Sequence, residues 1–164
     1  MDFENLNRLP EFGFSGGVSV SDLQASCKSV PSEQGVYLVV RESDQPVRFL
    51  EVGTGGRFKG RDPSVSVSVL ETRWLVQPKV LYVGKAGGTS NRTTLQGRVH
   101  SLMRFGLGRP CAHWGGRYIW QLVDARKLAL FWKQTHEEPR QVEKAILCAF
   151  IERYGQLPFA NLKR

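Results

Sequence analysis

Two short apolar runs rich in valine limit the fold of this chain more than any other feature. Residues 35–41 read GVYLVVR, and residues 79–84 read KVLYVG. Runs of this length and composition are typical of strands buried in a core. Each run also carries one tyrosine, Tyr37 or Tyr82. Because tyrosines on neighbouring strands can meet at one edge of a sheet, we expect a buried sheet that contains both.

Three further segments have strand character. Residues 47–52 (VRFLEV) alternate between apolar and polar side chains after a turn cluster, and residues 117–123 and 128–135 predict a pair of strands. Residues 64–75 begin with the alternating pattern SVSVSV and then favour a helix. These segments would add strands to the sheet that holds the two tyrosines.

Two segments have the spacing of amphipathic helices. Residues 93–106 carry apolar side chains at helical intervals, with Thr93 or Thr94 as the N-cap and Gly106 as the C-cap. Residues 139–155 give the clearest pattern, because Pro139 suits a first turn and Gly155 suits a helix end.

The order of these elements predicts an α/β sandwich in which helices flank a small antiparallel sheet. Strict β-α-β alternation is absent from the pattern, so a doubly wound nucleotide-binding fold is not expected. Residues 1–33 mix Gly, Ser and Pro with short apolar patches, and we expect an irregular lead-in there, with one short helix near residues 21–26. Residues 34–164 then form one domain with an insert at residues 46–78.

The charge of the chain is unevenly distributed. Residues 1–45 carry three basic and seven acidic side chains, a net charge of −4, whereas residues 46–164 carry 20 basic and eight acidic ones, a net charge of +12. Such asymmetry is typical of a protein with a polyanionic partner, most often nucleic acid, and a solubility surface is the alternative. Most of the positive charge is arginine, whose planar fork suits phosphate.

The sequence also predicts a compartment. No apolar stretch reaches the length of a membrane span, and the acidic N-terminus lacks the apolar segment of a signal peptide. Cys27, Cys111 and Cys148 are odd in number, far apart and without a C-x-x-C pair. We expect a reduced, cytoplasmic chain without membrane contact.

The stretch KVLYVGKAGG (residues 79–88) resembles a phosphate-binding loop, because a strand leads into glycines and a lysine. The P-loop pattern G-x-x-x-x-G-K-[ST] fails, since Ala86 follows Lys85 and Lys79 stands where the first glycine belongs. The dinucleotide pattern G-x-G-x-x-G is not met either. A bound nucleotide is therefore not expected at this loop.

The two tyrosine motifs are followed along the chain by three further candidate site residues. GVY (35–37) and YVG (82–84) precede Arg98 on the first predicted helix, Glu143 on the last helix and Asn161 near the end. In this order the chain resembles the GIY-YIG nuclease family, over about three-quarters of its length. That family includes homing endonucleases, the cleavage domain of a bacterial excision-repair subunit and some restriction enzymes. The resemblance implies a GIY-YIG-like sandwich.

The resemblance also implies a role for each motif residue. Tyr37 would help to deprotonate the attacking water, and Tyr82 would orient that water or the scissile phosphate. Arg98 would hold the phosphate and offset its developing charge. Glu143 would bind a single Mg²⁺ or Mn²⁺, and Asn161 would order the site.

This assignment is consistent with the chemistry of phosphodiester hydrolysis. The reaction adds negative charge to an anionic group, so a guanidinium and a metal stabilise its transition state more than its ground state. Mg²⁺ prefers oxygen ligands and keeps most of its waters, so one glutamate can suffice. A tyrosine is a poor base unless nearby cations such as Mg²⁺, Arg98 or Lys85 lower its pKa.

Two departures from the family pattern concern an insert and a histidine. Tyr37 and Tyr82 are separated by 44 residues, and the tip of the insert, GGRFKGR (55–61), interleaves basic residues with an aromatic one, which suits nucleic acid. Several relatives carry a histidine four residues after the arginine, where this chain has Leu102. His100 would point elsewhere. For His113 we expect a structural role, and whether either histidine takes part in the site stays open. The candidate nucleic-acid-binding residues are Lys85, Arg57, Lys59, Arg61 and Arg104.

The first functional hypothesis is therefore a Mg²⁺-dependent endonuclease that cuts DNA, as a monomer or a homodimer. A non-catalytic nucleic-acid-binding domain of the same fold and an RNA-directed nuclease are the alternatives. Restriction, mobile-element, repair and defence roles remain open, as does sequence specificity.

Overall fold

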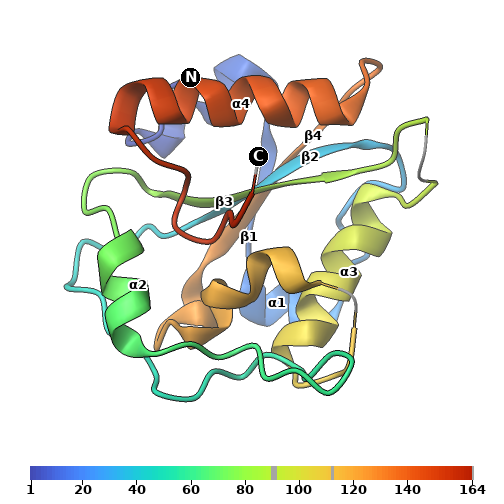
Figure 1. The fold of residues 1–164 in the computed structure, drawn as a ribbon. Coiled ribbons are helices and arrows are strands. Elements are labelled where there is room, and N and C mark those ends of the chain that lie inside the picture. The colour runs from blue at the N-terminus through green and yellow to red at the C-terminus, as the bar shows by residue number, and fades with distance from the viewer. Residues whose placement is uncertain (90–91, 112, 164) are drawn as a thin grey trace.

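A four-stranded antiparallel sheet lies between α4 (Pro139–Tyr154) with the N-terminal segment on one face and the other helices on the opposite face (Figure 1). The computed structural model describes residues 1–89, 92–111 and 113–163. The strands follow the order β1 (Ser15–Ser19), β4 (Ala129–Gln134), β2 (Gly35–Val40) and β3 (Val80–Ala86). The expectation of a single α/β domain with a small antiparallel sheet flanked by helices is confirmed.

The two valine-rich runs form neighbouring strands, as expected. All six residues of β2 are buried between β4 and β3. β3 lies at the edge of the sheet, yet it is almost fully buried because the C-terminal segment covers its open side. The Ala160 N–H donates to the Leu81 carbonyl (2.8 Å). The side chain of Asn161 then accepts from the Val83 N–H and donates to the Val83 carbonyl, both at 2.8 Å. An exposed strand edge is an aggregation risk, and this segment removes it.

Alternation along the strands divides the core into two layers. Val36, Leu38 and Val40 of β2 face α4, where they meet Leu147 and Phe150. Tyr37 and Val39 face the opposite side, where they join a larger cluster that includes α1 (Val20–Ala25) and α3 (Leu95–Gly106). Because neighbouring residues of a strand point to opposite faces, the tyrosine is placed on the side that carries the site.

The first 33 residues differ from the irregular lead-in that the sequence predicts. They contain η1 (Leu6–Phe12), β1 and α1, and β1 pairs with β4 as an edge strand. The short helix expected near residues 21–26 corresponds to α1. Gly16 and Gly17 hid the strand from pattern reasoning, since both adopt positive φ next to a shift in the register of β1 against β4.

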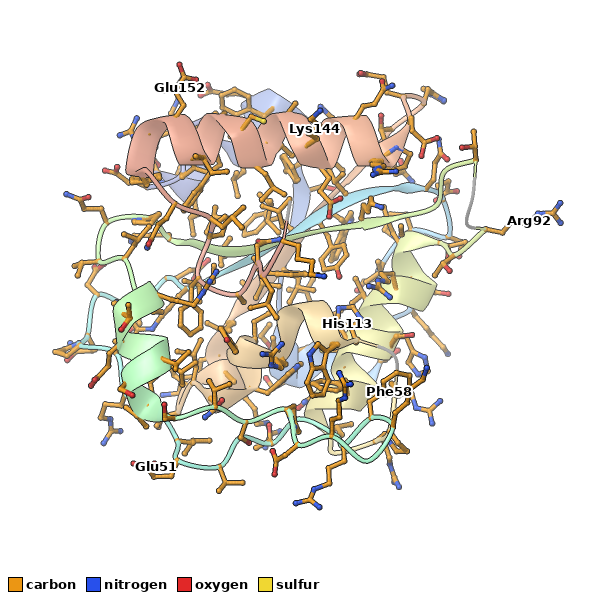
Figure 2. All side chains as sticks on the ribbon, in the orientation of Figure 1. Glu51, Phe58, Arg92, His113, Lys144 and Glu152 are labelled. Atoms are coloured by element: carbon orange, nitrogen blue, oxygen red, sulfur yellow. The ribbon has the colours of Figure 1, made fainter. Side chains whose placement is uncertain are left out.

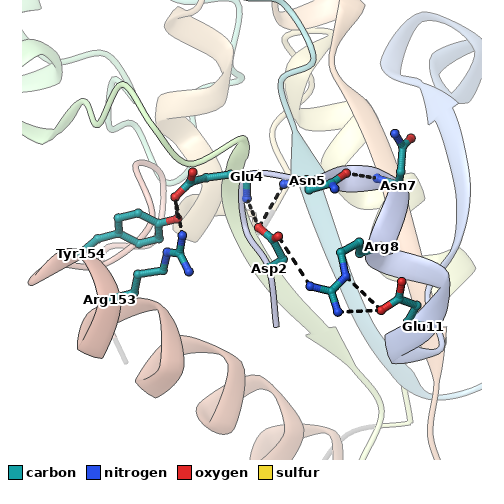
Figure 3. Close-up of polar contacts among 8 residues, drawn as sticks. All are labelled: Asp2, Glu4, Asn5, Asn7, Arg8, Glu11, Arg153 and Tyr154. Atoms are coloured by element: carbon teal, nitrogen blue, oxygen red, sulfur yellow. Dashed lines mark hydrogen bonds and ion pairs between the residues drawn. The ribbon is translucent and has the colours of Figure 1, made fainter.

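Polar contacts hold the N-terminal segment against α4 (Figure 3). Glu4 accepts a hydrogen bond from the Tyr154 hydroxyl (2.8 Å) and pairs with Arg153 at 2.9 Å. Arg8 pairs with Glu11 at 2.9 Å. Beneath them Phe3 packs edge-on against Phe150, with ring centroids 4.9 Å apart. The acidic start of the chain is thus part of the folded domain.

Both predicted helices are present. α3 begins after the N-cap Thr94, whose hydroxyl accepts from the Gly97 N–H (3.1 Å). Gly106, the expected C-cap, is the last residue of the helix, and Leu107 is the C-cap. α4 has Pro139 in its first turn and the left-handed Gly155 at its C-cap, as predicted. Residues 90 and 91 of the loop before α3 lie outside the described residues.

Two predicted strands are wrong. Residues 47–52 contribute only an isolated bridge between Phe49 and Leu122, and residues 117–123 mostly form η2 (Trp114–Gln121), a 3-10 helix followed by η3 (Ala125–Lys127). The two segments bond to each other instead of the sheet: the Leu50 N–H donates to the Gln121 carbonyl at 2.8 Å. β4, which corresponds to the strand predicted at 128–135, pairs with β1 and β2.

The insert at residues 46–78 packs into the core. It contains α2 (Val67–Arg73), where the serine-valine alternation had suggested a strand start. The buried amide of Gln121 accepts from the Val65 N–H (2.9 Å) and donates to the carbonyls of Leu50 (3.1 Å) and Val65 (2.8 Å). One side chain therefore satisfies three backbone groups of the insert and fixes its path.

Candidate active site

A cleft of about 460 Å³ opens at the junction of β3, α3, η2, α4 and the C-terminal segment. These elements come from distant parts of the chain, and each contributes at least one polar or aromatic side chain. The lining residues are Tyr82, Lys85, Gly87, Arg98, Trp114, Gly115, Glu143, Asn161, Leu162 and Lys163.

The structure brings the predicted site residues together. Tyr82, Arg98, Glu143 and Asn161 all line this cleft, although up to 79 positions separate them in the sequence. Tyr37 lies directly behind Tyr82 and is fully buried, with the two ring centroids 6.0 Å apart. The expectation that the two tyrosines meet is confirmed.

The register of β2 and β3 explains why the tyrosines meet. Tyr37 lies opposite Gly84, and Val39 lies opposite Tyr82, so the tyrosines are diagonal neighbours on one face. A Cβ at Gly84 would lie 2.3 Å from Tyr37 Cζ. The ring of Tyr37 therefore occupies the space that a side chain at position 84 would fill. The glycine serves the packing of the tyrosine, and its role in the YVG motif is steric.

Glu143 supplies the only carboxylate among the described residues that line the cleft. It extends from α4, and Lys85 lies on β3 with its Nζ 3.8 Å from Glu143 Oε2. Partial burial raises the pKa of the Glu143 carboxyl, and the positive charges of Lys85, Arg98 and Arg140 oppose that rise. The carboxylate is thus partly desolvated and faces cations, which favour its ionised form.

The donor set fits a hydrated divalent cation. Mg²⁺ binds through one or two carboxylates and substrate phosphates while it keeps several waters. Glu143 can provide that carboxylate at the cleft wall, with 20% of its side chain exposed. Among the described residues no group of three or more His, Cys, Asp or Glu side chains is close enough to form a complete protein cage.

Both tyrosines are protonated in the protein alone. Burial raises the pKa of Tyr37 well above its ordinary value, and the neighbouring Tyr82 raises it further. Burial also raises the pKa of Tyr82, while the Arg98 guanidinium opposes this through its charge and a hydrogen bond. Additional positive charge in the cleft would favour loss of the phenol proton, which must come before either oxygen can act as a base.

His113 lies beside the two tyrosines and is buried. Its Nε2 lies 3.2 Å from the Tyr37 hydroxyl oxygen, and its ring centroid lies 6.4 Å from that of Tyr82. Burial, assisted by the charge of Arg98, lowers the pKa of His113 to about 3. The imidazole is therefore neutral at physiological pH. Figure 2 shows it at the start of η2, between that element and α3. Sequence spacing did not point to it because it lies in an irregular loop.

Asn161 is held by backbone groups, as its bonds to Val83 show. Arg73 of the insert donates to the carbonyls of Asn161 (2.6 Å) and Phe159 (3.2 Å). The ring of Phe159 packs against Trp74 and Phe49, with centroids 5.1 Å and 5.8 Å away. The insert thus supports the C-terminal wall of the cleft, a role that the sequence did not reveal.

Trp114 is a second residue that sequence reasoning missed. It lines the cleft from η2, and the guanidinium carbon of Arg117 lies 4.8 Å from the centroid of its ring. Burial lowers the pKa of Arg117, and the positive charge of Arg73 adds to that effect. An aromatic side chain at the wall of this cleft offers a surface on which a base or sugar could stack.

The remaining predicted nucleic-acid contacts lie outside the cleft. Of the five, only Lys85 lines it. The tip of the insert forms a tight turn. The backbones of Phe58 and Arg61 form an isolated β-bridge there, and Arg57 pairs with Asp62 at 3.2 Å. Gly56 anchors this loop to the end of α3 through a hydrogen bond from its N–H to the Phe105 carbonyl (2.8 Å). His100 and Arg104 are exposed on α3 and do not reach the cleft.

Comparisons with known proteins leave the family open: no family model, curated protein or solved structure matches the chain. Within residues 1–89, 92–111 and 113–163, no helix is long and apolar enough to cross a membrane.

Proposed function

We propose that this protein is a metal-dependent endonuclease of the GIY-YIG type that hydrolyses DNA phosphodiester bonds. The observation that carries the proposal is the cleft itself. Tyr82, Arg98, Glu143 and Asn161 line one opening with Lys85, and Tyr37 lies immediately behind them. A simple binding surface has no need for a largely buried glutamate and two buried tyrosines in a cleft that also contains a lysine and an arginine.

The protein's own groups suit attack of water on a phosphate. Arg98 and Lys85 present positive charge to the phosphate oxygens, where negative charge grows in the transition state. Tyr82 lies at the cleft surface to orient the water, and Tyr37 behind it can take part in the proton's removal. A bound Mg²⁺ would supply Lewis-acid stabilisation of the same charge, with Glu143 as its protein ligand. The net reaction breaks one P–O ester bond and adds the elements of water.

Plasmid cleavage tests this function. Purified protein is incubated with supercoiled DNA and with RNA, with and without Mg²⁺. We expect metal-dependent nicking of DNA that falls about a hundredfold or more in Glu143→Gln, because the variant loses the metal ligand. Glu152→Gln is the matched control, since this glutamate is exposed near the far end of α4 (Figure 2) and retains full activity.

Three outcomes would contradict the proposal in different ways. Equal cleavage by Glu143→Gln would assign the activity to another site or to a contaminant. Tight, salt-sensitive binding without cleavage in Mg²⁺ or Mn²⁺ would indicate the non-catalytic binding domain. Cleavage of RNA in preference to DNA would retain the chemistry and change the substrate.

A further inference from the structure

The two ring nitrogens of the buried His113 differ in their hydrogen bonding. The imidazole is fully buried, and Nε2 contacts the Tyr37 hydroxyl at 3.2 Å. Nδ1 is also buried and has no hydrogen-bond partner among the residues that the structure describes. One ring nitrogen is therefore satisfied and the other is not.

This imbalance selects one tautomer of His113. With a proton on Nδ1, the ring would bury an N–H without an acceptor, and such orphaned donors are rare in folded proteins. With the proton on Nε2, the ring leaves only a lone pair unpaired and donates to the Tyr37 oxygen. An imidazolium would carry the orphaned N–H and a buried charge as well, facing Arg98.

The tautomer then determines where the proton of Tyr37 points. If the Tyr37 oxygen accepts from His113, its own O–H is directed to a different acceptor. The ring of Tyr82 is the neighbour of Tyr37 on the cleft side, with the two centroids 6.0 Å apart, and Tyr82 lines the cleft. The buried histidine, Tyr37 and Tyr82 thus form a series that leads from the core to the cleft.

We propose that His113 is a positioning residue whose Nε2–H donates to the Tyr37 hydroxyl and directs the Tyr37 proton toward Tyr82 and the cleft. Its catalytic meaning rests on the proposed nuclease function. A neutral donor stabilises a phenolate at Tyr37 without placing a second cation next to Arg98. The place four residues after Arg98 holds the buried Leu102, so this histidine reaches Tyr37 from a loop rather than from α3.

Ring-nitrogen NMR tests the hydrogen bond independently of activity. In ¹⁵N-labelled protein at neutral pH we expect a protonated Nε2 and an unprotonated Nδ1 for His113, assigned by the signals that vanish in His113→Gln. Tyr37→Phe should move the Nε2–H resonance, because the acceptor is lost. A proton on Nδ1, an imidazolium, or an Nε2–H that ignores Tyr37→Phe would each overturn the proposal.

The pH–rate profile of plasmid nicking tests the role in catalysis. His113→Leu removes the donor, whereas His113→Gln retains an amide N–H. We expect the alkaline rise of the rate to move up by about one pH unit in His113→Leu and about tenfold slower turnover at neutral pH, with DNA affinity unchanged. His113→Gln should recover most of the rate, and His100→Gln, on an exposed surface, should match the parent.

The results separate this inference from the proposed function. If the parent protein cuts no nucleic acid, the nuclease proposal fails while the NMR experiment still decides the hydrogen bond. If the parent cuts and the Leu and Gln variants share one unshifted profile, the positioning role is wrong. Should His113→Leu not fold, the tautomer and its response to Tyr37→Phe decide the question.

Discussion

At the scale of single residues, the site depends on groups that compensate for each other's shape and charge. The ring of Tyr37 occupies the space that a side chain at position 84 would need, and Lys85 pairs with Glu143 at the cleft. His113 is neutral because it is buried next to Arg98. None of these relations follows from a residue type alone, since each depends on which side chain lies opposite.

Gly84→Ala tests the steric relation. The new Cβ would lie 2.3 Å from Tyr37 Cζ, and the ring cannot move away because it is fully buried. We expect the free energy of unfolding, measured in urea, to fall by about 2 kcal/mol or more. Gly97→Ala is the matched control, because its Cβ would approach no atom closer than 3.4 Å and alanine favours the helix by up to about 1 kcal/mol. Equal stabilities of the two variants would contradict the packing argument.

His113 also predicts how stability changes with pH. Its pKa falls from 6.5 in the unfolded chain to about 3 in the fold. Below pH 6.5 the unfolded state therefore binds a proton that the folded state does not, so stability is complete above that pH and is lost as the pH falls. Between there and about pH 5, before most carboxyl groups titrate, the loss should be about 2 kcal/mol.

Chemical unfolding at several pH values measures this slope. His113→Gln should flatten it, and His100→Gln should leave it as in the parent. A slope that survives His113→Gln would show that another group is responsible.

At the scale of elements, the edges of the sheet are completed by segments that lack strong sequence signals. β1 closes the edge at β4, and the C-terminal segment covers the edge at β3. The insert holds that segment in place through Arg73 and the aromatic cluster around Phe159. A site that opens next to Asn161 thus depends on an element more than 80 residues earlier in the chain.

Removal of residues 1–19 tests the role of the N-terminal segment. The truncation exposes the backbone of β4 and removes Phe3, Leu9 and Phe14 from the α4 layer of the core. We expect a chain without a cooperative thermal transition, monitored by circular dichroism and by the dispersion of amide NMR signals. Phe3→Ala is the milder companion, with an expected cost of about 3–5 kcal/mol. A truncated chain that melts cooperatively at the parent's temperature would mean that these residues are merely appended.

At the scale of the whole molecule, charge is separated along the chain and also on the structure. The acidic N-terminal segment packs along α4, where Glu4 pairs with Arg153, whereas Arg98, Lys85 and Lys163 line the cleft at the junction of α3, β3, α4 and the C-terminal segment. The basic tip of the insert is anchored to the end of α3, the helix that supplies Arg98. This arrangement suits a polyanion that extends past the cleft.

Salt dependence tests whether the tip binds the polyanion. Replacing Arg57, Lys59 and Arg61 with Gln should reduce the slope of log binding constant against log salt for duplex DNA by up to about 2.7, because about 0.9 is lost per phosphate contact. The control combines Arg8→Gln and Arg153→Gln, whose parent side chains pair with acids in the N-terminal segment. An unchanged slope in the triple variant would show that the tip does not contact phosphate.

The predictable part of this protein comes from strong local patterns. The runs at 35–41 and 79–84, the helical periods at 93–106 and 139–155, and the strand at 128–135 each appear in the structure. The strands predicted at 47–52 and 117–123 were wrong. Short apolar runs fit a helix or a strand equally well, and the backbone groups of these two segments bond to each other rather than to the sheet. Tyr37, Tyr82, Arg98, Glu143 and Asn161 were found by their order along the chain. His113 and Trp114 lie in a segment without periodicity, and the partner of Arg73 is Asn161, 88 positions further along the chain.

The composition of the core and the chemical groups available to the cleft follow from the amino-acid sequence alone. Alternation and helical spacing are properties of neighbouring residues, so they can be seen without a fold. Three contacts become visible only in the folded chain: Gly84 makes room for Tyr37, the C-terminal segment covers β3, and a buried histidine meets the first tyrosine. These contacts join residues between 47 and 78 positions apart, and such pairings depend on register and packing rather than on any local pattern.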